Sequence, residues 1–253
     1  MSKRFLIGFI VGLSLMFVVG VGASRQKQKS IEGANFQAEF DGATPLHLGS
    51  MTERQRLHSK LFNGFRPSDE RITDLIAPYR GKRIVYGISV SCRRAELFND
   101  PQTPEDFIVK LSRESDAVVR GKVLDKASEV TDDGKFIFTD YSVLVKEVIK
   151  NNAKAPLSPG TTITVTSPGG KVLIADVIVK TSSNGFGNLP INNHYVVLFL
   201  TFLPETSDYK LTRHDGGFEL DGTFVRQIAG QFATGFFGDR DSFLQTTRAI
   251  SNK

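Results

Sequence analysis

The sequence contains few of the residues that usually form catalytic or metal-binding sites. Its 253 residues include a single cysteine, Cys92, four histidines and no tryptophan. One cysteine cannot form a disulfide within the chain, so burial of apolar side chains must stabilise the fold. The histidines form neither an HxH nor an HxxxH pair, the spacings that commonly place two ligands on one zinc ion. The sequence therefore predicts no metal site and no bound cofactor.

Recognisable catalytic motifs are equally scarce. No serine lies in a Gly-x-Ser-x-Gly elbow, and the acidic pairs at 132–133 and 239–241 lie in turn-like sequence without EF-hand spacing. Cys92 is followed by Arg93 and Arg94, whose positive charges favour a reactive thiolate. A buried, inert cysteine at a strand end is the alternative. We predict no catalytic residue and retain Cys92 as a candidate reactive thiol.

The N-terminal residues carry the pattern of a secretory signal. Lys3 and Arg4 precede an apolar run, which ends in the small residues Val21-Gly22-Ala23. This pattern predicts a signal peptide over residues 1–23 and export to the periplasm, the cell surface or the medium. An uncleaved membrane anchor over residues 5–22 is the alternative, because about 17–25 apolar residues span a bilayer. In either case we expect membrane contact only through residues 1–23.

The net charge is small. It is +5 for the whole sequence and +3 without residues 1–23, because Lys3 and Arg4 are then lost and no acidic residue is. The remainder contains no block of basic residues. A basic patch is the usual electrostatic signature of a nucleic-acid-binding domain, so we expect no nucleic-acid partner.

The segment before the main domain combines a linker with a helical region. Residues 24–49 are polar and aperiodic, which indicates a flexible linker. Residues 50–100 predict a helical hairpin and a leading strand. Ser50 and Glu53 have the capping-box spacing that starts a helix.

The main domain, residues 101–235, has strand periodicity after one initial helix. Thr103 followed by Pro104 is a strong helix start. From residue 116 the apolar period is two, turns separate the strands, and a break in phase at Lys146 indicates a β-bulge. These features predict a mainly β, OB-like barrel, closed or partly open, with flanking helices and an α+β class overall. Residues 236–253 predict a tail with a short helix.

One strand stands out by composition. Tyr195 to Leu203 is almost wholly apolar, as expected for a strand that is buried on both faces. We expect the helix that begins at Pro104 to cover one of those faces.

A series of segments within residues 105–226 resembles a known group of proteins. The segments are DAVVRGKV, TDYSVLVKEVIK, TITVTSPGG, HYVVLFL and YKL followed by GGFEL. They resemble uncharacterised exported bacterial proteins with small OB-type barrels, similar in outline to netrin-like and metalloproteinase-inhibitor domains. The group often has a Gly-Glu pair where this chain has Asn193-His194. Inhibitory netrin-like domains use an N-terminal cysteine, which this chain lacks, so the resemblance implies a fold and no functional residue.

The sequence favours an exported, non-enzymatic binding or interaction module whose partner is a protein or another envelope component. The alternatives are an OB domain that binds oligosaccharide or nucleic acid, and a hydrolase with a scattered active site. Binding residues often lie on long polar loops, and the segment from Lys180 to Asn193 is such a loop within the main domain. The candidate binding residues in and beside it are Ser182, Asn184, Phe186, Asn188, Asn192 and His194.

Overall fold

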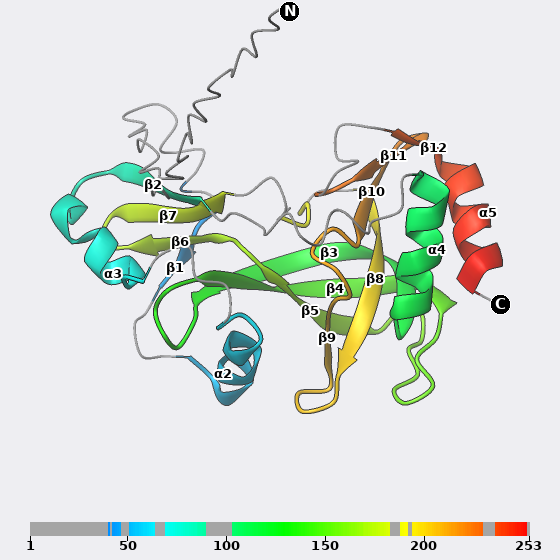
Figure 1. The fold of residues 1–253 in the computed structure, drawn as a ribbon, viewed down its shortest axis with the longest axis horizontal. Helices are drawn as coiled ribbons and strands as arrows, with labels where there is room; N and C mark the ends of the chain where they lie inside the picture. The colour runs from blue at the N-terminus through cyan, green and yellow to red at the C-terminus, as the bar shows by residue number, and fades with distance from the viewer. Residues whose placement is uncertain are drawn as a thin grey trace, which may run out of the picture.

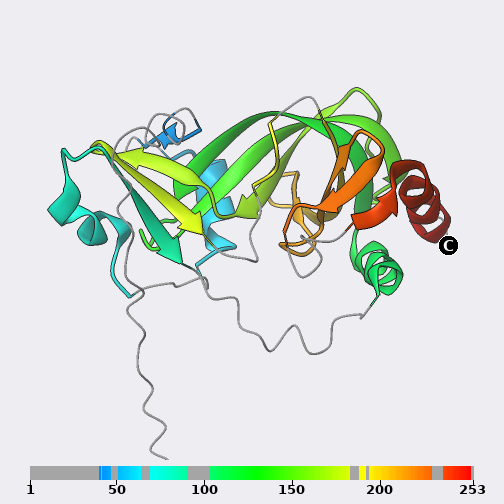
Figure 2. The same cartoon turned by 90° about the horizontal axis from the view of Figure 1, so that it is seen from above.

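The computed structural model shows a mixed α+β fold with more strand than helix (Figure 1). It describes residues 40, 42–46, 51–63, 69–89, 103–182, 188–191, 194–229 and 236–251. Two sheets lie side by side (Figure 2). Two long strands of the larger sheet reach the smaller sheet with the ends that contain Val130 and Ile137, and these two residues pack against it. None of the described helices is long and apolar enough to cross a membrane. Residues 1–23 lie outside the described ranges, so the signal peptide stays a prediction.

The smaller sheet has the strand order β1-β6-β7-β2. Its strands are β1 (Thr44–Pro45), β2 (Ile84–Ser89), β6 (Lys171–Ile174) and β7 (Val177–Ser182). The short helices α3 (Ile72–Leu75) and η1 (Ala77–Tyr79) precede β2. Ile72 and Ile76 are fully buried against this sheet and the ends of the long strands.

The larger sheet has the order β12-β11-β10-β8-β3-β4-β5-β9, and β9 also pairs with β8. This second pairing closes a ring of five strands, β8-β3-β4-β5-β9, in which only the β5–β9 pair is parallel. The strands are β3 (Ala117–Val130), β4 (Ile137–Lys150), β5 (Thr162–Pro168), β8 (Tyr195–Leu203), β9 (Asp208–Leu211), β10 (Gly217–Asp221), β11 (Phe224–Gln227) and β12 (Phe236–Asp239).

Strand β8 is buried on both faces, which confirms the interpretation of its apolar sequence. Val196, Leu198 and Leu200 point into the ring, whereas Val197 and Phe199 pack on the outer side. Two helices cover that outer side, α4 (Pro104–Glu114) and α5 (Arg240–Ser251). The expected cover by α4 is therefore confirmed. Tyr195, at the start of the strand, keeps 37% of its surface exposed.

The predicted bulge in β4 is also confirmed. Arg120 pairs with Glu147, and the next residue, Gly121, pairs with Val145, so Lys146 is the extra residue. A Cβ atom at Gly121 would lie 2.8 Å from the Leu144 carbonyl oxygen. Glycine therefore lets the two long strands approach closely where they bend.

The second sheet was not expected from the sequence, whose patterns predict that all strands after residue 101 belong to one barrel. The segment from Lys171 to Ser182 leaves the ring and folds back on itself as β6 and β7. Ala175 and Asp176 both have positive φ, at 47° and 65°, as in a two-residue hairpin turn. The helix start near Ser50 also needs correction, because Thr52 is the N-cap and forms a capping box with Gln55.

Gly170 lies where the chain leaves the ring, and replacing it should strain that junction. Its φ is 146°, and an added Cβ would lie 2.2 Å from Thr139 Oγ1 and 2.6 Å from Ser128 Oγ. We expect Gly170→Ala to lower the free energy of unfolding by about 1–3 kcal/mol. Gly160→Ala is the control, because Gly160 also has positive φ but no atom within 4 Å of the added Cβ. Equal urea midpoints for the two variants would contradict this account of the junction.

Candidate functional site

Helix α2 (Glu53–Lys60) docks on the ring through polar side chains. Its sequence, ERQRLHSK, contains one apolar residue, Leu57, and its buried residues are His58 and Ser59. The capping box starts the helix, since the Gln55 amide N–H donates to Thr52 Oγ1 (3.2 Å) and the Thr52 amide donates to Gln55 Oε1 (2.8 Å). Within the helix, polar contacts therefore fix the position of α2, and Phe62 just beyond it adds an apolar contact with Phe136 and Phe138.

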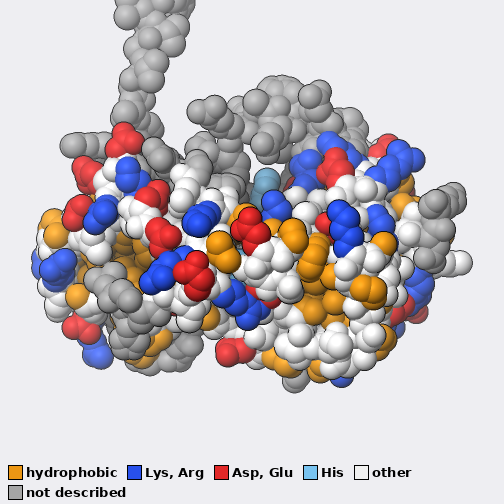
Figure 3. Space-filling view, turned by 90° about the horizontal axis from the view of Figure 1, so that it is seen from below, with side chains coloured by type: hydrophobic (Ala, Val, Ile, Leu, Met, Phe, Trp, Pro, Cys, Tyr) orange, Lys and Arg blue, Asp and Glu red, His pale blue; other side chains and the backbone are white. Residues whose placement is uncertain are grey.

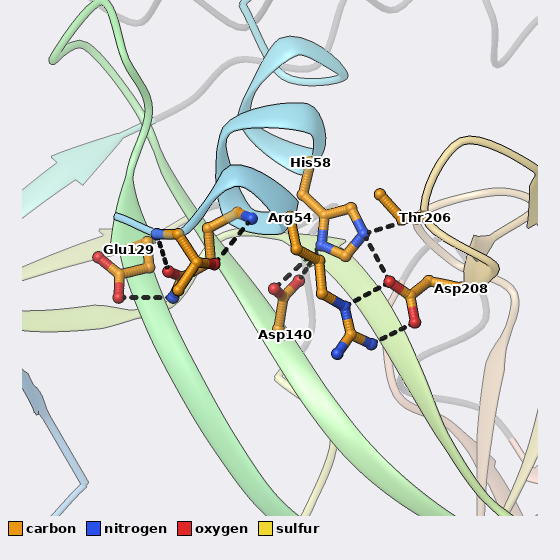
Figure 4. Close-up of polar contacts among 8 residues, drawn as sticks. Arg54, His58, Glu129, Asp140, Thr206 and Asp208 are labelled. Atoms are coloured by element: carbon orange, nitrogen blue, oxygen red, sulfur yellow. Dashed lines mark hydrogen bonds and ion pairs between the residues drawn. The ribbon is translucent and has the colours of Figure 1, made fainter. Parts of the chain in front are cut away.

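His58 is the centre of these contacts (Figure 4). Its side chain is 1% exposed, and Nδ1 lies 2.9 and 3.0 Å from the two carboxylate oxygens of Asp140 on β4. Nε2 lies 3.2 Å from Thr206 Oγ1 in the β8–β9 turn and 3.2 Å from Asp208 Oδ2 on β9. Both ring nitrogens are therefore occupied by partners from the ring of strands.

Further contacts surround this histidine. The Arg54 guanidinium, one helical turn earlier, donates two hydrogen bonds to Asp208. The Gln55 side chain donates to Glu129 on β3 (2.9 Å), and the Asp132 amide in the β3–β4 turn donates to Ser59 Oγ (2.7 Å). We refer to Arg54, His58, Asp140, Thr206 and Asp208 as the histidine clamp.

The two acids keep the histidine protonated. Burial by itself lowers the pKa of His58, but its hydrogen bonds with Asp140 and Asp208 outweigh burial and raise the pKa to about 9. Burial likewise opposes ionisation of Asp208, yet hydrogen bonds from His58 and Arg54 hold its pKa below the ordinary value. At neutral pH the clamp therefore holds two cations, Arg54 and His58, beside its acidic residues.

Three clamp residues occur in the order of a hydrolytic triad. Asp140 contacts Nδ1 of the imidazole and Thr206 contacts Nε2, as an acid, a histidine and a nucleophile do. A general base must accept a proton at the working pH. With its pKa raised to about 9, the buried His58 holds both protons at neutral pH, so that Nε2 donates to the Thr206 hydroxyl and cannot accept a proton from it. The arrangement suits ionic attachment of α2 better than proton transfer.

Two cavities adjoin α2. One, of about 230 Å³, is lined by Arg54, Lys126, Asp140 and Ser142 among others, and the second, of about 280 Å³, has Arg71 and Glu129 in its wall. Figure 3 views the molecule from the side on which α2 lies in Figure 1, and acidic and basic side chains intermix there around a hollow between the two halves. Neither sign of charge dominates this face.

Most of the candidate residues from the sequence fall outside the part of the chain that the structure describes. Cys92, Asn184, Phe186 and Asn192 fall outside the described residues, as does the side chain of Ser182.

Asn188 and His194 bond to different strands, so the structure does not bring these two candidates together. Asn188 Oδ1 accepts from the Tyr141 hydroxyl of β4 at 3.3 Å, and the adjacent Leu189 is buried in the ring interior. His194 Nδ1 lies 2.9 Å from Glu219 Oε1 on β10. One end of the candidate binding loop is thus part of the ring's core.

The acidic pair at 132–133 lies in a turn, as predicted, whereas Asp239 instead ends β12 and caps the start of α5. Asp133 accepts hydrogen bonds from Thr131 and Lys135 within the β3–β4 turn, and Asp239 accepts from the amides of Asp241 and Ser242 at the start of α5. Within the described ranges no three histidine, cysteine or acidic side chains gather as metal ligands.

Sequence reasoning missed the histidine clamp. The one local signal was the i, i+4 spacing of Arg54 and His58 on a helix with almost no apolar residues, which places both on one face. No protein-family model matches the chain, and a search of the curated proteins finds no significant match.

Proposed function

We propose that the chain is an exported, non-enzymatic binding module in which the five-stranded ring is an OB-type barrel. An OB fold is a five-stranded, partly open Greek-key barrel, and the strand number, the closing β8–β9 pair and the flanking helices support that assignment. The resemblance of residues 105–226 to exported proteins with OB-like, netrin-like barrels supports it independently.

The position of α2 carries the proposal. OB folds bind ligands over the second and third strands, between the loops that follow the first and fourth strands. In this ring those loops are the β3–β4 turn and the β8–β9 turn. Ser59 contacts Asp132 in the first turn and His58 contacts Thr206 in the second. Helix α2 therefore occupies the place of an OB ligand, and we propose this face as the binding face.

The chemistry of the face favours a protein or another envelope component as partner. Asp140 and Asp208 lie at its centre, and two carboxylates repel a phosphate backbone. An oligosaccharide is the second candidate, because the cavity of about 230 Å³ beside α2 offers carboxylates, hydroxyls and an amide side chain.

Hydrolysis is the third candidate function, and only the triad-like order of Asp140, His58 and Thr206 supports it. If a hydrolytic activity were measured and the Thr206→Ala variant retained it, a triad with Thr206 as nucleophile would be excluded.

Export is a separate part of the proposal. The charged start, the apolar run and the small residues before Ser24 support cleavage after Ala23. N-terminal sequencing of the exported protein should give Ser24, and recovery of intact Met1 in the membrane fraction would favour the anchor.

Affinity capture from a cross-linked envelope fraction tests the binding face. We expect wild-type protein to recover a partner that Thr206→Ala and Glu129→Ala variants recover less well, because both side chains belong to the ring and face α2. His194→Ala is the matched control, since His194 bonds to β10 and not to the face. Equal recovery by all four proteins would contradict the proposal. A loss with His194→Ala alone would place the site at the loop that ends there.

A further inference from the structure

We propose that the binding face accepts a basic helix of a partner protein in exchange for α2. The helix would present a cation, a second cation and an aromatic residue at positions i, i+4 and i+8. This inference rests on the proposed binding role and names the chemistry of the partner.

The spacing is that of α2 and the residue Phe62 beyond it, which cover the binding face in this chain. Arg54, His58 and Phe62 follow one another at intervals of four. Phe62, just beyond the helix, stacks on Phe138 of β4 with 5.6 Å between ring centroids and contacts Phe136 at 6.3 Å. The face thus has two carboxylates for the cations and an aromatic pair for the third residue.

The acceptor residues are held in place by the ring itself. Asp140 pairs through the backbone with Ala127 of β3 on one side and Thr166 of β5 on the other, and Asp208 pairs with Leu203 of β8. Their side chains are 14% and 6% exposed, respectively. These exposures apply with α2 in place, where His58 and Arg54 cover the two acids. Removal of α2 therefore leaves two neighbouring acidic side chains whose positions the strands fix, and such a surface favours a cationic occupant.

The attachment of α2 is of an exchangeable kind. The buried residues of the helix itself are polar, and Phe62 just beyond it is a buried apolar side chain, so most of the attachment consists of ionic and hydrogen-bonding contacts. A helix from another protein with the same cations would satisfy the same carboxylates. Such a helix must compete with α2, whose tether gives it an effective concentration on the order of millimolar. A free peptide should consequently bind wild-type protein weakly, and bind better when α2 is weakened.

A labelled peptide of residues 51–63 measures this exchange by fluorescence anisotropy on the mature chain. Arg54→Gln in the protein weakens α2 and leaves the face intact, so we expect the peptide to bind this variant at least about tenfold more tightly than wild type. Adding Asp208→Asn to that variant removes an acceptor carboxylate and should return the affinity for the peptide to the wild-type level or below. Lys60→Gln, on the exposed side of α2, is the matched control and should bind like wild type.

Peptide chemistry and folding are controlled separately. A peptide with Arg54→Gln and His58→Gln should not bind any of the proteins. Circular dichroism verifies that each variant is folded, and Asp140→Asn replaces Asp208→Asn if the latter is not.

Three outcomes would overturn the inference. The first is equal binding of the peptide by wild type and Arg54→Gln, and the second is undiminished binding after loss of the acceptor. The third is dimerisation of Arg54→Gln that the peptide reverses, which would make the occupant a second copy of this chain. If the peptide does not bind but capture of a partner still depends on Thr206 and Glu129, only the helical partner is overturned and the binding face stands.

Discussion

Replacing Phe199 by alanine should lower the free energy of unfolding by about 3–5 kcal/mol. The side chain is fully buried between β8 and the helices α4 and α5, and its ring meets Phe218 edge-on with 5.7 Å between centroids. The neighbouring rings cannot collapse fully into the space, so the lost burial and the remaining cavity both contribute.

Urea denaturation of wild type and Phe199→Ala measures this effect. Tyr195→Ala on the same strand is the control, because Tyr195 is 37% exposed and contacts the cationic groups of Arg120 and Lys122. That variant should lose about 1 kcal/mol or less. An unchanged unfolding midpoint for Phe199→Ala would mean that β8 is not the central strand.

The second large effect is a loss of stability as pH rises. The folded-state pKa of His58 is raised from 6.5 to about 9. A raised folded-state pKa stabilises the fold fully below the unfolded value, and this contribution disappears as pH rises from about 6.5 through about 9. We expect a loss of about 3 kcal/mol between pH 6 and pH 10, because a tenfold change in proton affinity on folding corresponds to about 1.4 kcal/mol.

Other groups titrate over the same range, so His58→Gln provides the comparison. Glutamine forms hydrogen bonds but carries no charge, and this variant should lack the His58 part of the pH dependence. It should also be less stable than wild type at pH 6, by about 3–5 kcal/mol, because two buried carboxylates lose a cation. Parallel pH dependence of the unfolding free energies of the two proteins would exclude a protonated His58.

Local sequence signals predicted the elements that depend on local physics. The N-cap at Thr103, the doubly apolar β8 and the phase break at Lys146 each reflect a few neighbouring residues. The smaller sheet depends instead on parallel pairs between distant segments, such as Ile84 with Val177. Nothing near Ile84 in the sequence specifies that partner, so β6 and β7 were expected in the barrel.

The candidate site was harder to predict for the same reason. Asp140 lies in an apolar strand, and Asp208 resembles a residue of the preceding turn. Neither is near His58 in the sequence, and only closure of the ring brings them together. Composition pointed instead to the loop before His194, since long polar loops often bind ligands.

The protonation state of His58 is the most direct test of the histidine clamp. NMR titration of the imidazole in ¹⁵N-labelled protein should show both ring nitrogens protonated at pH 7 and a midpoint at about pH 9. Asp140→Asn should lower that midpoint, because it removes the charge beside Nδ1. A neutral imidazole at pH 7, with a midpoint at or below about 6.5, would contradict the ionic attachment of α2 and favour a histidine that can act as a base.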